Sequence, residues 1–415
     1  LAIVQDTKQP NLMFLGTDDG LYVSIDAGRN WAKYTNGFPT VPVKDLVIHQ
    51  REDDLVIATF GRSFWVLDDI NPLRELAKNS TFQANLMSEN GTVLKVVPPS
   101  TEYLAAIQQP TGSRFGADAT FSGENRSRGA EIRYFFKPEK QEKKEDADKM
   151  EEELESEKEA QESGKDSIVV KIYDGDRQIR TLKTKAPDST GIYGIRWYLN
   201  EKGADRPSRK IVEQKEEPGG VTVKPGTYKV VMSYGDMESS EDITVKSDPR
   251  LELSKAAINE VYNAEKELEK KMQLAADAVK QLVESKNASE DFQSRLKKDD
   301  KEKYKEEIEA SKKMIEEIEK KIALFLGEED ERQGIVRSRE MNVVNRLGLA
   351  SGYVGSRPKG LTKTEEQLIA QAEAELKSAI EKVNSFYKEE WPGYRTKMEQ
   401  VEISPFKEVQ TFTLE

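Results

Sequence analysis

The chain has 415 residues, which is enough for two to four domains that each have their own core. Its formal net charge of −12 argues against a nucleic-acid-binding protein, because phosphate contacts need clustered Lys and Arg. The lack of cysteine excludes disulfides and zinc–thiolate sites, the single histidine (His49) leaves little histidine chemistry, and no run reaches the roughly 18–20 apolar residues needed to span a membrane.

Residues 1–69 consist of short apolar stretches separated by turns. We expect seven strands there, in "LAIVQD", "NLMFLGT", "GLYVSID", "WAKYT", "VKDLVIHQ", "DLVIATF" and "RSFWVLD". Their regular spacing favours the antiparallel blades of a propeller, or a sandwich. Seven strands make fewer than two four-stranded blades, and "LAIVQDTKQP" contains neither an initiating Met nor a signal peptide. We therefore expect the back part of a longer protein whose upstream blades complete the propeller.

Residues 70–129 are expected to be a connecting segment with one or two helical turns in "NPLRELA". A second β region covers residues 130–250, with strands in "AEIRYFF", "SIVVKIYDGD", "QIRTLKT", "GIYGIRWYLN", "GTYKVVMSYGD" and "SEDITVKS". These strands alternate apolar and polar residues, which predicts a small immunoglobulin-like sandwich with Trp197 as a core anchor.

An acidic insertion, residues 138–167, separates the first two strands of this region. It contains 13 acidic and 6 basic residues and few apolar ones. Such a segment cannot bury enough apolar surface to fold alone, so we expect a solvated loop. A partner-binding acidic arm is the alternative.

Residues 251–400 have helical periodicity and are followed by a tail over residues 401–415. Apolar residues recur at steps of three, four or seven in 258–282, 304–325 and 368–387. The narrow apolar stripes and charged flanks predict helices packed in a hairpin or bundle. Expected breaks at "KNASED" and "KKDD" favour this arrangement over a long coiled-coil dimer.

The expected ends of these helices carry recognisable signals. Gly327 suits the C-terminal end of the second helix, and Thr362 and Glu365 have capping-box spacing before the third. A shorter helix is expected in "VRSREMNVVNRLGLA".

The stretch "SIDAGRNW" contains the distinctive motif of the first region. Its spacing Ser-x-Asp-x-Gly-x-x-Trp is formed by Ser24, Asp26, Gly28 and Trp31. Asp26 is suited to accept hydrogen bonds from turn amides, and Gly28 supplies a permissive backbone angle. The motif resembles the Asp-box, the bacterial neuraminidase repeat, with Asn30 where that family usually has Thr. The resemblance implies a structural role, because Asp-boxes of sialidase-like propellers lie on blade edges far from the central site.

The stretch "DLVIATFGRSFWVLDDI" resembles the closing blade of large bacterial sortilin-like and neuraminidase-repeat proteins. In that blade a Gly-Arg pair precedes an apolar-Trp strand that ends in Asp-Asp. The corresponding residues are Gly61, Arg62, Trp65, Asp68 and Asp69. Phe60 stands where members often have His, which removes any polar role of that His.

The second β region extends this resemblance. "VVKIYDGDRQIRTL" and "VKPGTYKVVMSYGD" are similar to the immunoglobulin-like module of flagellar hook-capping proteins, which follows the propeller in these bacterial proteins. The resemblance covers residues 1 to about 250, and the helical tail follows the same layout by periodicity alone. It implies an exported protein, in the periplasm, at the cell surface or secreted. Such proteins are called glycosyl-hydrolase-like because of their propeller, so the resemblance implies this fold but not a hydrolase activity.

No catalytic constellation can be assembled from the sequence. Glycosidases need two suitably separated carboxylates, and none of the 76 acidic residues can be paired by spacing. We interpret as turn residues Asp18, Asp19, Asp68 and Asp69. We interpret as core residues, with a sugar platform as the alternative, Tyr22, Phe60, Phe64 and Trp65. We interpret as solvated charges, with carboxylate or phosphate binding as the alternative, Arg126, Arg128 and Arg133.

Together these observations predict a multidomain β + α chain with partial propeller blades, an immunoglobulin-like β-sandwich and an α-helical hairpin or bundle. We expect a non-catalytic C-terminal portion of an exported bacterial propeller protein, with no cofactor and no metal site. Its expected partners are the upstream blades and a protein or glycan ligand. Two alternatives stay open: the C-terminal portion of a sialidase-like or related glycoside hydrolase with its catalytic carboxylates upstream, and a peptidase-like or protease-associated accessory protein.

Overall fold

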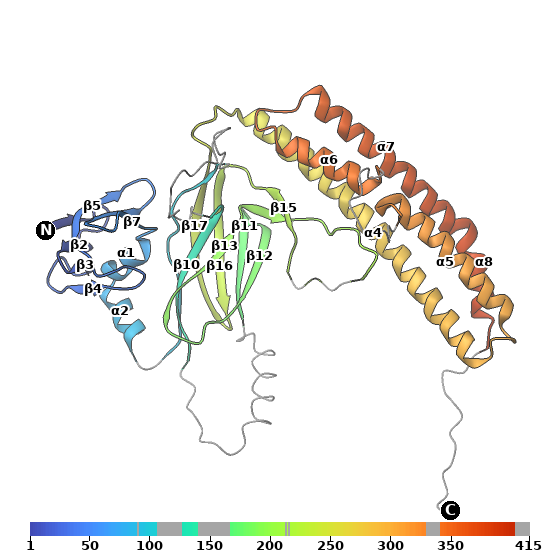
Figure 1. Ribbon diagram of the computed structural model, residues 1–415, viewed down its shortest axis with the longest axis horizontal. Helices are drawn as coiled ribbons and strands as arrows, with labels where there is room; N and C mark the ends of the chain where they lie inside the picture. The colour runs from blue at the N-terminus through green and yellow to red at the C-terminus, as the bar shows by residue number, and fades with distance from the viewer. Residues whose placement is uncertain are drawn as a thin grey trace, which may run out of the picture. The chain divides into compact units, whose positions relative to one another are not determined.

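The chain folds into two compact units. The computed structural model describes residues 1–88, 91–105, 127–139, 167–211, 214, 216–328 and 341–402. One unit contains Leu1–Lys202 and Thr222–Glu252, and the other contains Gly203–Val221 and Leu253–Glu415. The first is built mainly from antiparallel sheets and the second mainly from helices, so the expected mixed β + α multidomain class is confirmed (Figure 1).

The first unit begins with two small antiparallel sheets. The first sheet has the order β1-β2-β3-β4, with strands Ala2–Gln5, Met13–Thr17, Gly20–Ser24 and Ala32–Tyr34. The second has the order β5-β6-β7, with strands Val43–His49, Asp54–Thr59 and Phe64–Leu67. The seven strands expected in this region are therefore confirmed.

These two sheets share one hydrophobic core. Side chains alternate across a strand, and this alternation directs Phe14 of β2 and Leu55 and Ile57 of β6 into the shared core. Gly16 allows the sheets to approach closely, because a Cβ at this position would overlap the side chain of Val43.

Two helices and two short strands follow within the expected connecting segment. Helix α1 is Asn71–Lys78 and α2 is Ser80–Met87, and strands β8 and β9 are Val93–Val96 and Glu102–Leu104. The α1 helix lies in the predicted stretch "NPLRELA", whereas α2, β8 and β9 were not expected from the sequence. The strands β8 and β9 pair with strands of the second β region, so this segment contributes to its sheets.

The second β region forms two sheets that face each other. A three-stranded sheet has the order β13-β10-β8, in which β10 is Ala130–Lys137 and β13 is Gly191–Trp197. A five-stranded sheet has the order β12-β11-β16-β17-β9. Its longer strands are β11 (Ser167–Asp174), β12 (Arg177–Lys185), β16 (Gly226–Tyr234) and β17 (Met237–Ser247).

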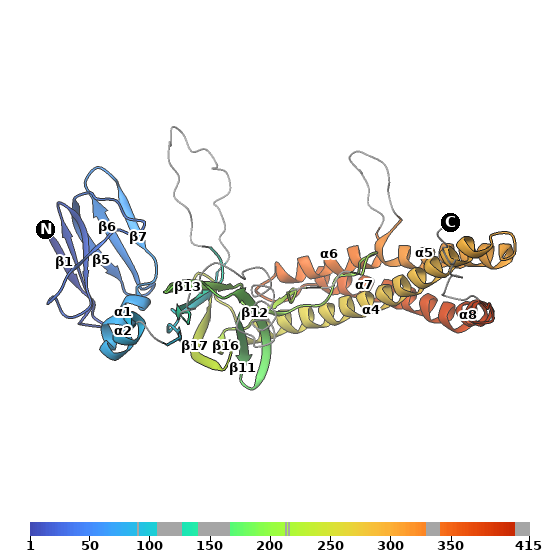
Figure 2. The same ribbon diagram turned by 90° about the horizontal axis from the view of Figure 1, so that it is seen from below.

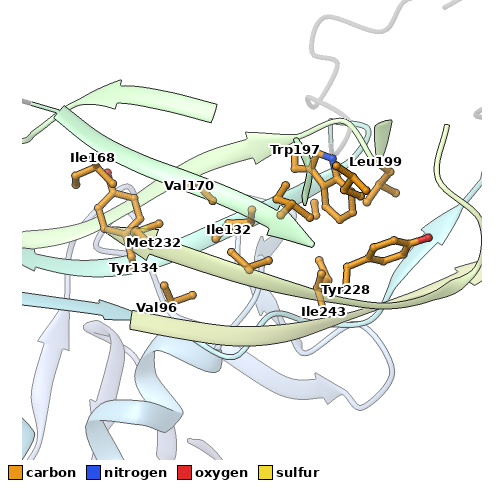
Figure 3. Close-up of a cluster of buried hydrophobic side chains, with 14 of the residues drawn as sticks. Val96, Ile132, Tyr134, Ile168, Val170, Trp197, Leu199, Tyr228, Met232 and Ile243 are labelled. Atoms are coloured by element: carbon orange, nitrogen blue, oxygen red, sulfur yellow. The ribbon is translucent and has the colours of Figure 1, made fainter. Parts of the chain in front are cut away.

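The facing sheets enclose the larger core of the first unit (Figure 3). Ile132 and Tyr134 project from β10 toward Val170 of β11 and Met232 of β16. Trp197 is fully buried, which confirms its expected role as a core anchor, and its indole N–H donates to the Asn200 carbonyl at 2.8 Å.

The second unit is a bundle of helices preceded in sequence by the segment Gly203–Val221. Short strands β14 (Asn200–Lys202) and β15 (Gly219–Thr222) flank this segment. The helices are α4 (Lys255–Asp299), α5 (Lys305–Leu326), α6 (Val343–Gly355), α7 (Lys363–Ser385), the π-helical turn η1 (Phe386–Glu390) and α8 (Trp391–Glu399). The expected capping box of Thr362 and Glu365 is present, and Gly327 caps α5 with a positive φ of 78°.

The break expected at "KNASED" is wrong, because α4 runs through this stretch without interruption. The stretch contains neither Gly nor Pro, and Ser289 is buried with its hydroxyl donating to the Ser285 carbonyl at 2.8 Å. This bond satisfies the hydroxyl inside the helix, so the polar residue does not end it. The helix ends at Asp299, within the second expected break, "KKDD".

Several sequence-based expectations lie outside the described residues. These are nearly all of the acidic insertion 138–167, Arg126, the start of the shorter helix and most of the C-terminal tail.

The helical unit depends on one shared apolar core, to which Ile318 of α5 contributes a fully buried side chain. We expect Ile318→Ala to lower the free energy of unfolding by about 2–5 kcal/mol, because it leaves a cavity among packed helices. Urea denaturation followed by far-ultraviolet circular dichroism measures this loss. Leu274→Ala is the matched control, because this α4 side chain is 48% exposed, and it should change stability by less than about 0.5 kcal/mol. Equal losses in the two variants would contradict this assignment of the core.

Candidate functional site

The "SIDAGRNW" stretch forms a closed network of local hydrogen bonds at the end of β3. The Ser24 hydroxyl donates to Asp26 Oδ1 at 2.8 Å and accepts from the Gly28 amide at 2.9 Å. Asp26 also accepts from the backbone amide and the side-chain amide of Asn30, at 2.9 and 2.7 Å. The Trp31 indole N–H donates to the Gly28 carbonyl at 3.0 Å. The polar groups of this turn therefore bind one another.

These bonds also explain the residue types at three positions. Gly28 has a φ of +81° and lies against the Trp31 ring, a conformation that favours glycine. Asn30 supplies a second donor to Asp26 from the position that usually holds Thr in the resembling family. The backbone and side-chain bonds from Asn30 lower the pKa of Asp26 to about 2. A carboxylate held this firmly in its ionised form is poorly suited to general acid–base catalysis near neutral pH.

A second turn of related geometry precedes β7. The Trp65 indole N–H donates to the Arg62 carbonyl at 3.0 Å, as Trp31 does within the first turn. Thr59 donates to the Ser63 carbonyl through both its amide and its hydroxyl, at 3.1 and 2.6 Å. Gly61 and Ser63 both have positive φ angles, of 83° and 59°. Gly61 and Arg62 of the expected closing strand thus lie in its turn.

The sequence-based assignment of Phe60 and Phe64 to the core is wrong. They are 70% and 73% exposed, whereas Trp65 packs edge-on against Phe38 with ring centroids 5.4 Å apart. Strand β7 is at the edge of its sheet, and alternation along it directs Trp65 inward and Phe64 outward. Tyr22 lies on the first sheet and donates to Asp19 at 3.1 Å.

The outward surface of the β5-β6-β7 sheet carries an apolar patch, bordered on β5 by Asp45 and His49. Strand register aligns Val47 with Val56 and Val56 with Val66, and it pairs Ala58 with Phe64. These three strands lie side by side (Figure 2), so their outward residues form one surface, named here the outer face. Val47 and Val66 are each 55% exposed. This sheet therefore has an apolar inner surface and an apolar patch on its outer face, a property that the sequence analysis did not recognise.

The two acidic residues at the end of β7 have different environments. Asp68 is exposed, whereas the Asp69 side chain is largely buried and lies 3.1 Å from Arg133 of β10. Asp69 has a φ of +56°, and its amide donates to Asp54 at 2.9 Å. Arg133, one of the candidate anion-binding arginines, thus pairs with a carboxylate of the same unit and connects β7 to the second β region.

The acidic pair in the β2–β3 turn binds lysines of the same sheets. Asp18 pairs with Lys44 and Asp19 with Lys33, each at 2.9 Å. These hydrogen bonds lower the pKa of both carboxyls. His49 is exposed, and its Nδ1 accepts a hydrogen bond from a backbone amide of the next turn.

A buried cluster of charged side chains in the first unit surrounds Arg74 of α1. Its guanidinium binds Asp6 in a bidentate manner, with distances of 2.6 and 2.9 Å. It also donates to Asp53 at 2.6 Å and to Asn71 at 2.8 Å. Asp6 follows β1 and Asp53 lies in the β5–β6 turn, so one side chain connects both small sheets to α1. We name these residues, with Lys8 and Ser100, the Arg74 cluster.

Lys8 and Ser100 complete the polar contacts of this cluster. Lys8 donates to Asp53 at 2.5 Å, and the Ser100 hydroxyl lies 3.5 Å from Asp53 and 2.9 Å from the Asn71 amide nitrogen. Burial opposes ionisation of Asp53, but its bonds to Lys8 and Arg74 outweigh burial and lower its pKa. The cluster is thus a compensated network suited to holding backbone segments together. The sequence analysis did not identify Arg74. An arginine on the apolar side of the helix "NPLRELA" could have indicated a buried ion pair.

Among the described residues, no group of three or more His, Asp or Glu side chains is arranged to hold a metal ion. Within the same residues, no helix combines the length and apolar character that a membrane span requires. Comparisons with protein-family models, curated proteins and solved structures found no match. The geometry above is therefore the basis for a functional interpretation.

We expect Asp26→Ala to lower the melting temperature of the first unit, because the Asn30 and Ser24 donors lose their acceptor. The pKa of Asp26 is depressed, so the stability that it contributes is present above about pH 4 and is lost as the pH falls through about 2. The difference between the wild type and the variant should therefore narrow between pH 4 and pH 2 when thermal unfolding is followed by tryptophan fluorescence. Asp68→Ala is the control. A difference that stays constant with pH would count against this role of Asp26.

We expect Arg74→Met to destabilise the first unit by about 3–5 kcal/mol, because it leaves the buried carboxylates of Asp6 and Asp53 without their main cation. Chemical denaturation of the full chain measures this change. Arg62→Met replaces an exposed arginine and should alter stability by no more than about 0.5 kcal/mol. If Arg74→Met were as mild as Arg62→Met, the cluster would not hold the sheets to α1.

Proposed function

We propose that this chain is a non-catalytic portion of an exported bacterial β-propeller protein that serves as a scaffold for binding proteins or glycans. The two small sheets are its terminal blades, the facing sheets are an immunoglobulin-like module, and the helices form a bundle that presents a further surface. Export rests on the family resemblance of the sequence.

The observation that carries this proposal is the outer face. A sheet with apolar residues on both surfaces is typical of a sheet covered on both sides. One surface of β5-β6-β7 packs on the first sheet, and the opposite surface exposes Val47, Val66 and Phe64. The proposed partner of this surface is another antiparallel sheet, an upstream blade of the same protein, stacked as the first sheet is on the inner surface.

The hydrogen bonds of the Asp-box turn support a structural role for its acidic residue. Both oxygens of Asp26 accept bonds from within the turn, and Trp31 bonds back to Gly28. The Asp69 carboxylate forms an ion pair with Arg133. Two of the carboxylates that the propeller resemblance singles out, Asp26 and Asp69, therefore stabilise backbone and sheet contacts rather than face a reacting group.

Two contacts support the immunoglobulin-like assignment of the facing sheets. The Tyr228 hydroxyl donates to the Lys224 carbonyl at 2.6 Å, which matches the way a tyrosine corner bonds to backbone a few residues upstream. Trp197 packs edge-on against the Tyr228 ring, with centroids 5.5 Å apart. A buried tryptophan in the shared core is also a feature of that module.

Hydroxyl-radical footprinting tests the proposed partner surface. In the chain alone, Phe60 and Phe64 should be oxidised readily, because both are highly exposed. In a longer chain that carries the upstream blades, oxidation of Phe64 should fall severalfold because a stacked sheet excludes solvent from it. Tyr198, which is 66% exposed in the second β region, is the internal control and should be labelled equally in both chains. Equal labelling of Phe64 in the two chains would contradict the proposal.

The same longer chain should bind but not hydrolyse glycans when it is screened on sialosides and on plant and algal polysaccharides. Turnover that is abolished by mutation of a single upstream carboxylate would instead identify a glycoside hydrolase.

A further inference from the structure

Helix α4 presents acidic side chains to glycine-containing backbone of neighbouring segments. Glu260 accepts a hydrogen bond from the Leu361 amide at 3.2 Å, and a Cβ at Gly360 would lie only 2.7 Å from the same carboxylate oxygen. Glu269 pairs with Lys266 and lies against Gly220, where a Cβ would overlap its oxygen. Both of these carboxylates therefore have a donor or a cation.

Glu265, between these two residues, has a different environment. A Cβ at Gly355, the last residue of α6, would lie 2.8 Å from Glu265 Oε1, so the backbone of α6 approaches this carboxyl as closely as glycine allows. Among the described residues, no Lys or Arg forms an ion pair with Glu265. The charge of Glu269, one helical turn away and also acidic, acts on this carboxyl.

This environment disfavours a negative charge. Burial, reinforced by the charge of Glu269, raises the pKa of Glu265 from 4.5 to about 7. Two charged groups on the adjoining segments have partners of their own, since Lys266 binds Glu269 and Arg357 binds Glu365. Glu265 therefore changes its charge near neutral pH.

We propose that Glu265 is a proton-controlled contact, which holds the C-terminal end of α6 against α4 when it is protonated and loosens that end when it ionises. Opening of this end exposes the carboxyl to water and returns its pKa toward the ordinary value. The closed form consequently binds a proton that the open form releases between about pH 4.5 and pH 7. Closure is favoured at the acidic side of this window and weakens as the pH rises through the pKa of the closed form.

The amides at the end of α6 provide the readout. The Ser356 and Arg357 amides donate to the Tyr353 and Val354 carbonyls at 3.2 and 3.0 Å, so both become exchangeable when the end opens. Hydrogen exchange of the full chain, corrected for the intrinsic effect of pH on exchange, should show their opening constants rising about tenfold or more from pH 5.5 to pH 8.5. In Glu265→Gln this rise should vanish.

Glu267→Gln is the matched control, because Glu267 lies on the same helix, is exposed and pairs with Lys270. It should keep the wild-type pH dependence. Glu269→Gln removes the neighbouring negative charge and should move the midpoint of the transition to lower pH. Protection that is independent of pH in the wild type, or a pH dependence that survives in Glu265→Gln, would overturn the proposal. A carboxyl-carbon NMR titration of Glu265 in the wild type gives a second test if Glu265→Gln fails to fold, and a midpoint near 4.5 would also overturn it.

Discussion

The first unit depends on the buried bonds of Arg74. Removing a guanidinium from water is costly, and only directed bonds to Asp6, Asp53 and Asn71 compensate for that loss. The apolar cluster through which α1 packs on the two small sheets includes Ala77 and Leu73 of the helix. Such a cluster tolerates sliding, whereas a bidentate guanidinium–carboxylate pair fixes distance and angle. The position of α1 on the two small sheets is therefore fixed by this polar geometry together with apolar packing.

The same division of roles appears within the small sheets. Polar residues at the Asp-box turn, which follows β3 of the first sheet, bond to one another, so this turn needs no external partner. The apolar residues of the outer face belong to the second sheet, and this is the surface that we propose binds a neighbouring sheet. In the proposed assembly, the apolar side chains of Val47, Val66 and Phe64 contact the partner sheet, while the carboxylates of Asp26 and Asp69 stabilise the fold.

Local features were predictable from the sequence, and distant ones were not. The Asp-box bonds join residues at most four positions apart, and the helical stripes repeat over a few turns, so both leave a pattern in the chain. Arg74 is 68 positions from Asp6 and 21 positions from Asp53 in the sequence. Contacts between such distant residues leave no periodic pattern in the sequence. The outward position of Phe64 was missed because an exposed apolar strand and a buried one have the same sequence pattern. The continuity of α4 was missed because the Ser289 hydroxyl bonds to the Ser285 carbonyl inside the helix, which the residue types alone do not indicate.

Two kinds of carboxylate occur in this chain. Those that accept hydrogen bonds stay ionised, whereas one without such donors changes its charge near neutral pH. Asp26 and Glu365 accept several hydrogen bonds, and their pKa values fall to about 2, so their charge is constant over the physiological range. Glu265 is held against glycine backbone beside another acid, and its pKa lies near 7. A motif search directs attention to Asp26, yet the chemistry that changes near neutral pH is on α4. Sensitivity to conditions thus arises where the fold leaves a charge without compensation.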